Sequence, residues 1–155
     1  MFNLFRYPIL YLSACAFFFF FDRLGKFVAQ SGSGADRALN SVLAFGYYPN
    51  QGIGFGIQMN KTIIVVASII IILVLAGWLV HVLKKEYVMQ AWGISFIIFG
   101  AINNLIDRVF FGQVIDYIKL FDWSLFNLAD AMIICGLILV LLGWQRSEAA
   151  HFTNK

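Results

Sequence analysis

Hydrophobic residues fill four long stretches of the chain, and charged or polar residues separate them. The uncharged runs cover residues 7–21, 62–80, 87–106 and 131–145. A helix rises about 1.5 Å per residue and the hydrocarbon layer of a membrane is about 30 Å thick, so the second and third runs are long enough to cross it. The pattern predicts transmembrane helices at about 7–29, 62–82, 87–107 and 129–146.

The first and fourth uncharged runs are shorter, at roughly 22 Å each as helices. To cross a membrane, these two helices must include residues beyond the uncharged part. This places Asp22 and Lys26 of the first helix, and Asp130 of the fourth, within the apolar layer or at its edge. Ionisable residues at that depth are costly and usually functional, so all three are candidate site residues.

The composition supports a membrane protein. Hydrophobic residues make up 61% of the 155 residues and charged residues 12%, whereas a soluble domain is about 25% charged. The net charge of +3 comes without a run of Lys or Arg, which argues against nucleic acid as a partner. Cys15 and Cys135 lie singly in apolar runs, so neither a disulfide framework nor a metal site is indicated.

A cleavable signal peptide is the alternative interpretation of the first run. Arg6 precedes it, and small polar residues follow at 30–35. However, Asp22, Arg23 and Lys26 lie where a cleavage region should be neutral. The segment is therefore predicted to remain as a helix.

Four spans would place both termini on one side of the membrane. When Arg23, Lys26 and Arg108 are set aside as site residues, the remaining positive charges favour cytoplasmic termini. Segments 31–61 and 108–128 would then lie outside. The first is predicted to form short strands around 39–49, and the apolar part of the second, 113–121, fits either a strand or an interfacial helix.

Two familiar kinds of site are disfavoured. The glycine-rich stretch 52–56 lacks the GxGxxG spacing and a following Lys-Ser/Thr pair, which indicates a turn rather than a phosphate-binding loop. His81 and His151 lie on the side of the termini, away from most of the acids. Neither histidine is therefore expected to bind a metal, and neither can act as the base that a serine or cysteine nucleophile would need.

Asp116 and Asp130 both belong to the outer rim of the predicted helices. Two carboxylates that lie close together in a low-dielectric site share one proton. The ionised one can accept a proton from water while the protonated one polarises a peptide carbonyl. The alternatives are that Asp130 caps the fourth helix and that Asp116 is a solvated loop acid. Asp107 and Arg108 are interpreted as an interfacial charge pair or a helix end.

Four sequence blocks occur in a characteristic order: 50–56 (NQGIGFG), 100–108 (GAINNLIDR), 112–117 (GQVIDY) and 126–131 (FNLADA). They resemble the successive signature blocks of bacterial lipoprotein signal peptidase, or signal peptidase II, and Asp22 and Lys26 fit a further block. The resemblance implies one all-α membrane domain over residues 1–155. It has four transmembrane helices, a small extracytoplasmic β-cradle within 31–61 and a short interfacial helix within 113–121.

The resemblance also implies an activity. The family contains aspartic endopeptidases of the bacterial cytoplasmic (inner) membrane, which cut diacylglyceryl-modified prolipoproteins on the N-terminal side of the lipidated cysteine. Such an enzyme would act as a monomer at the outer face, without cofactor or metal, with membrane lipid and the lipid-modified substrate as partners. Asp116 and Asp130 match the catalytic pair. Supporting or substrate-binding residues would be Asn50, Gly52, Asn104, Arg108 and Asn127, together with Asp22 and Lys26.

One departure from the family pattern concerns helix packing. Ala101 and Asn103 stand where the family usually has glycine, which brings close approach of the third helix to its neighbours into question. Two other classes of function are consistent with the residues alone. A small ion- or proton-coupled carrier would use Asp22 and Asp130 as a relay through the membrane. A non-catalytic scaffold protein would have no need of the rim acids.

Overall fold

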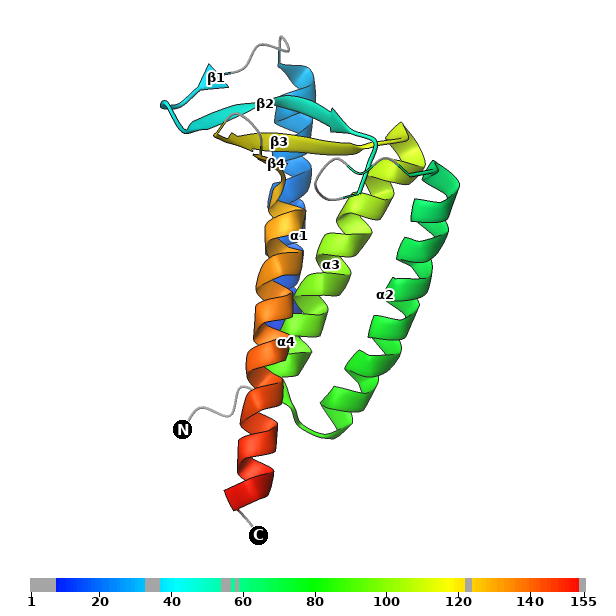
Figure 1. The fold of residues 1–155 in the computed structure, drawn as a ribbon, viewed down its shortest axis with the longest axis vertical. Helices are drawn as coiled ribbons and strands as arrows, with labels where there is room; N and C mark the ends of the chain where they lie inside the picture. The colour runs from blue at the N-terminus through cyan, green and yellow to red at the C-terminus, as the bar shows by residue number, and fades with distance from the viewer. Residues whose placement is uncertain (1–7, 33–36, 54–56, 58, 122–123, 154–155) are drawn as a thin grey trace.

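The computed structural model describes residues 8–32, 37–53, 57, 59–121 and 124–153, which are mostly helical. The helices are α1 (Pro8–Ser31), α2 (Lys61–Lys84), α3 (Val88–Phe111) and α4 (Leu128–Thr153). A small sheet lies across one end of them, and the α2–α3 turn lies at the other end (Figure 1). Its strands are β1 (Arg37–Ala38), β2 (Leu43–Asn50), β3 (Val114–Leu120) and β4 (Ser124–Phe126).

Three helices in the described part of the chain are long and apolar enough to cross a membrane. They are α2, α3 and the Leu128–Arg146 part of α4. Helix α1 has 24 residues but carries Asp22, Arg23 and Lys26, and it is not among the three. A fourth crossing by α1 therefore stays a prediction.

Helix α3 is the centre of the helical layer, because it packs against α1, α2 and α4. Its closest approach is to α4, where a Cβ atom built on Gly93 would lie 2.5 Å from the carbonyl oxygen of Gly136. Asn103 faces α1, and its amide donates a hydrogen bond to the Phe19 carbonyl at 3.1 Å. The departure from glycine at position 103 thus adds a polar link between α1 and α3.

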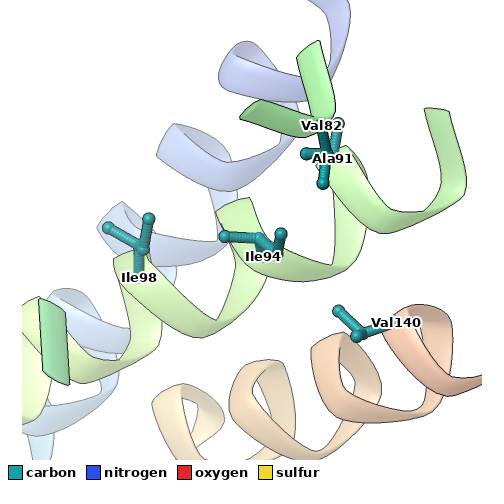
Figure 2. Packing of buried hydrophobic residues seen from close by; sticks show 5 residues of the cluster. All are labelled: Val82, Ala91, Ile94, Ile98 and Val140. Carbon is teal, nitrogen blue, oxygen red and sulfur yellow. The ribbon is translucent and has the colours of Figure 1, made fainter. Parts of the chain in front are cut away.

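A cluster of buried apolar side chains lies between α2, α3 and α4. It consists of Val82 on α2, Ala91, Ile94 and Ile98 on α3, and Val140 on α4 (Figure 2). Most other large apolar side chains of α2 are exposed, among them Ile70, Leu73 and Val74. An apolar outer surface of this kind suits a lipid environment, where the bilayer covers what a soluble protein would have to bury.

The sheet is antiparallel, with the strand order β1-β2-β3-β4. The interfacial helix expected within 113–121 is wrong, because residues 114–120 form β3, and the alternative of a strand is correct. Val114, Ile115 and Ile118 are β-branched and favour a strand, and β2 supplies a partner with Tyr48 opposite Asp116. The sheet therefore draws strands from both outer segments rather than from 31–61 alone.

Gly112 connects α3 directly to β3. Its φ of 79° is in the left-handed region, and its N–H donates to the Arg108 carbonyl at 3.2 Å, which ends the helix. Two residues later the strand begins. The last turn of α3 and the first half of β3 are thereby held together, and these are the segments that carry Arg108 and Asp116.

Candidate active site

The predicted site residues meet at the sheet end of the helices. Asp116 lies in the middle of β3, and Asp130 lies in the first turn of α4. The supporting residues come from four places in the chain: Asn50 at the end of β2, Gly52 just after it, Asn104 and Arg108 in the last two turns of α3, and Asn127 between β4 and α4.

Asn127 joins the two acids. Its amide nitrogen donates to Asp116 Oδ1 at 2.8 Å, and its backbone N–H donates to Asp130 Oδ2 at 3.2 Å. In return the Asp130 backbone N–H donates to Asn127 Oδ1 at 2.9 Å. This reciprocal pair is a capping box at the start of α4. Asp130 therefore does cap its helix, as one alternative expected, and the cap also fixes its carboxylate beside Asp116.

The remaining carboxylate oxygens of the pair are bound as well. Asn50 donates to Asp116 Oδ2 at 2.9 Å, and Asn104 donates to Asp130 Oδ1 at 2.8 Å. Each of the four oxygens thus accepts one N–H, which holds both groups in fixed orientations. Asp116 is only 1% exposed, so the interpretation of it as a solvated loop acid is wrong.

The environment of Asp116 makes its carboxyl a weaker acid than an ordinary aspartate. Burial raises the pKa of the Asp116 carboxyl to about 6. The hydrogen bonds from Asn50 and Asn127 oppose this rise in pKa, while the nearby charge of Asp130 adds to it. An acid with a pKa in this range can keep or release a proton close to neutral pH.

Arg108 and Asn50 hold the Gly52 peptide from two sides. Arg108 Nη2 donates to the Gly52 carbonyl at 3.1 Å, and the Gly52 N–H donates to Asn50 Oδ1 at 3.0 Å. The Arg108 charge also interacts with those of Asp116 and Asp130. A bridge joins Ile53 and Ile57, as expected for a turn, while residues 54–56 lie outside the described residues.

Asp22 and Lys26 form a buried charge cluster with α3. Lys26 Nζ lies 2.8 Å from Asp22 Oδ2 and 2.7 Å from Asp107 Oδ2, and Arg23 also pairs with Asp107. Two acids and two cations balance, as buried ions require. Asp107 is fully buried and pairs with α1, so the interpretation as an interfacial charge pair with Arg108 is wrong. The alternative of a helix end agrees with the position of both residues near the end of α3.

Sequence reasoning left Asp107 out of the site, although one feature points to it. Three charged residues occur within two turns of α1, a helix otherwise free of charge. Such residues need partners at the same depth in a neighbouring helix. Asp107, near the end of α3, was an available acid.

Tyr117 is a second residue that sequence reasoning missed. Its hydroxyl donates to Asp22 Oδ1 and accepts the Leu128 N–H, both at 3.2 Å. Burial and the charge of Asp22 raise the pKa of Tyr117, so the hydroxyl stays a donor. A Cβ atom on Gly25 would lie 2.7 Å from the tyrosine ring, so the glycine makes room for it on α1. Nothing in the local sequence indicates this contact.

Among the described residues, no three His, Cys, Asp or Glu side chains are grouped so that they could hold a metal ion. The arrangement consists instead of two adjacent carboxylates with amide donors, an arginine and a buried charge cluster behind them. Such a set can activate water and protonate a carbonyl oxygen.

Comparisons with known proteins show which family the chain resembles. The profile of the family described as Signal peptidase (SPase) II matches residues 14–145. The lipoprotein signal peptidase of Syntrophomonas wolfei is 41% identical over 66% of this chain and 70% of its own length. That of Moorella thermoacetica is 31% identical over 80% of this chain and 83% of its own length.

A solved structure, described as that of a bacterial membrane enzyme, has the same fold. It matches with a TM-score of 0.80 at 24% identity, over 93% of this chain and 92% of the other. The profile match covers most of the chain, including both acids and every supporting residue named above. On that match and on the similarity to the two relatives, this chain belongs to the signal peptidase II family, the lipoprotein signal peptidases.

Proposed function

We propose that the protein is an aspartic endopeptidase that removes signal peptides from diacylglyceryl-modified prolipoproteins, cutting on the N-terminal side of the lipidated cysteine. Membership of the family supports the substrate class. The observation that carries the aspartic mechanism is the pairing of Asp116 and Asp130 through Asn127, with an N–H donor on each carboxylate oxygen.

The two acids have different roles in this proposal. Asp130 is assigned as the ionised member, because its side chain is only half-buried and N–H groups donate to both of its oxygens at the start of α4, where the helix favours negative charge. Asp116 is assigned as the member that holds the shared proton, because it is the more fully buried of the two and burial raises its pKa to about 6. Asp130 accepts a proton from water as the water oxygen bonds to the scissile carbonyl carbon, and Asp116 gives its proton to the carbonyl oxygen.

The resulting tetrahedral intermediate collapses by the reverse proton movements. The C–N bond breaks as Asp130 returns its proton to the leaving nitrogen, and Asp116 recovers a proton from a hydroxyl as the carbonyl re-forms. Both acids end in their starting states, and no covalent enzyme intermediate is formed. Arg108 and Asn104 stabilise the ionised carboxylate through charge and hydrogen bonding.

The position of the acids fits a substrate that lies in the membrane. A lipid-modified precursor holds its cleavable bond at the bilayer edge, and the acids lie where the apolar helices meet the sheet (Figure 1). In this proposal both termini are cytoplasmic and the sheet lies at the outer face of the bacterial inner membrane. A carrier would instead need acids through the depth of the membrane, and α2 contains none.

The test is cleavage of a diacylglyceryl-modified prolipoprotein by the purified protein in detergent or liposomes. Wild type is compared with Asp116→Asn and Asp130→Asn, and the unlipidated precursor serves as the control substrate. We expect wild type to cut only the lipidated form and each variant to lose at least about a thousandfold in rate while still unfolding cooperatively. A wild type that cuts neither precursor contradicts the substrate class. A variant with full activity contradicts the aspartic mechanism.

A further inference from the structure

The buried ammonium group of Lys26 uses all three of its hydrogens. It lies 2.8 Å from Asp22 Oδ2, 2.7 Å from Asp107 Oδ2 and 3.0 Å from Asn104 Oδ1. An ammonium group has three donors and no acceptor, so its hydrogen-bonding capacity is filled. The side chain is 2% exposed, and the contacts therefore form inside the protein, away from solvent.

Each of these three acceptors touches one of the paired acids or its neighbour in the chain. Asn104 donates directly to Asp130 Oδ1. Asp107 accepts the N–H of Ile115, the residue before Asp116, at 3.3 Å. Asp22 accepts the N–H of Ala129, the residue before Asp130, at 3.1 Å. One cation on α1 thus lies behind both acids.

The bond from Lys26 also decides which way the Asn104 amide points. Because the ammonium can only donate, it requires the amide oxygen of Asn104, and the amide nitrogen must then face Asp130. A reversed amide would bring its hydrogens against the ammonium and its oxygen against a carboxylate. The Asn127 amide also donates to Asn104 Oδ1, at 3.1 Å, but the same amide nitrogen donates to Asp116 as well. The charge-assisted bond from Lys26 is the stronger constraint.

We propose that Lys26 is a positioning residue for peptide cleavage, which acts through Asn104 by keeping an amide N–H directed at Asp130. The inference rests on the proposed function, because it concerns the same pair of acids. Lys26 is buried behind the site, so its loss should lower kcat and leave the KM for the precursor within about twofold. If Lys26 had a purely structural role, its loss would lower stability and leave kcat of the folded enzyme unchanged.

The charge cluster offers a matched control. Arg23 pairs with the same Asp107 and has no contact with Asn104 among those found. In an Asp22→Asn background, either Lys26→Met or Arg23→Met leaves one cation and one acid in the cluster. The two double variants therefore carry the same net charge. They differ in which cation stays beside Asp107, and with it in the bond to Asn104. Lys26→Met and Arg23→Met are also made as single substitutions, and thermal unfolding of every variant is measured in detergent.

We expect Lys26→Met to lower kcat at least about tenfold more than Arg23→Met at comparable melting temperature. We also expect Lys26→Met to have no further effect once Asn104 is alanine, as for two residues that act in series. Equal kcat for the matched pair, or losses that multiply in the Asn104→Ala background, would overturn the proposal. If Lys26→Met does not fold, Lys26→Arg replaces it, since a guanidinium cannot donate to the same three acceptors in the same geometry. A wild-type kcat for that variant also overturns it.

Failure of this inference can be told apart from failure of the proposed function. The latter is contradicted by a wild type that cuts no precursor or by active Asp116→Asn or Asp130→Asn variants. The role of Lys26 is contradicted when wild type cuts the lipidated precursor and the Lys26 variants give any of the overturning results named above.

Discussion

Asn127 takes part in two local structures at once. Its side-chain oxygen and backbone N–H form the capping box of α4, while its amide nitrogen reaches Asp116 across the site. The residue is fully buried. A single side chain therefore links the start of a helix to the orientation of both acids, and its two functions can be separated by substitution.

Asn127→Ala and Asn127→Ser should differ in stability and agree in activity. Alanine removes the cap oxygen, at a cost of about 1–2 kcal/mol in the free energy of unfolding, and serine keeps an oxygen there and recovers most of it. Both lack the amide N–H to Asp116, so we expect cleavage to fall at least about tenfold in each. Thermal unfolding and cleavage rates measure the two effects. Recovery of activity together with stability in the serine variant would contradict the second role.

The burial of Asp116 predicts how stability depends on pH. Its pKa is about 6 in the folded state against an ordinary value of 3.8, so the folded protein binds more protons between these values. The free energy of unfolding should therefore fall as pH rises from about 4 through about 6, by roughly 3 kcal/mol from this group.

Asp116→Asn tests this dependence. The substitution exchanges one acceptor for a donor facing Asn50 or Asn127, which shifts stability at every pH. The informative quantity is the change in melting temperature between about pH 5 and about pH 8, which should be smaller in the variant than in wild type. The same change in both proteins would show that Asp116 does not titrate in this range.

At the scale of elements, the contact between α3 and α4 depends on paired glycines. Cβ atoms built on Gly93 and on Gly136 would each lie 2.5 Å from the carbonyl oxygen of the other residue. Backbone atoms cannot yield as a flexible side chain can. Because α4 carries Asp130 and α3 carries Asn104, the distance between these helices also sets the geometry of the site.

Gly93→Ala should destabilise the protein by roughly 1–3 kcal/mol, as expected for overpacking. Gly77→Ala on α2 is the matched control, because a Cβ atom there has nothing within 4 Å. It should leave stability unchanged or raise it by up to about 1 kcal/mol through helix propensity. Thermal unfolding in detergent compares the two, and an equal effect of both would argue against the helix contact.

The sequence was most informative where physical constraints are local. Long apolar runs predict membrane helices by length alone, and the ordered blocks point to the family, which is confirmed. The residues of those blocks do converge in the structure, although their catalytic roles stay predictions. The capping box at 127–130 is also visible in the sequence, since both of its partners lie within one turn.

Non-local contacts account for what was missed. The sequence of residues 114–120 is compatible with a strand or a helix, and the pairing with β2 decides for the strand. The partners of Asp107, Arg23 and Lys26, lie more than 80 positions earlier in the chain, so the sequence paired Asp107 with its neighbour Arg108 instead. The contact of Tyr117 with Asp22 likewise depends on how α1 packs against the sheet, which periodicity does not reveal.

The whole molecule has two different ends. The sheet and the acids lie at one end of the helices, and the α2–α3 turn with Glu86 lies at the other (Figure 1). If α2 and α3 cross the bilayer as their length allows, the two ends face opposite compartments. With Arg23, Lys26 and Arg108 set aside as site residues, the remaining positive charges favour the cytoplasm for the turn.

Cysteine labelling in intact cells tests this orientation. With Cys15 and Cys135 replaced, a cysteine at exposed Leu39 should react with a membrane-impermeant maleimide added outside. A cysteine at exposed Glu86 should react only after the membrane is permeabilised. The opposite pattern would place the acids in the cytoplasm and contradict the proposed site of action.

The long separation between the partners of α1 has a consequence for biosynthesis. The hydrogen bond from Ala129 to Asp22 joins positions 107 residues apart, so α1 leaves the ribosome long before its partners in α3 and α4 exist. During that interval Asp22 and Lys26 can pair with each other, one turn apart on the same helix. If α1 crosses the bilayer as predicted, the nascent helix brings its own counter-ion with it. We expect the enzyme to gain cleavage activity only after α4 has been synthesised and inserted, so that truncated chains stay inactive.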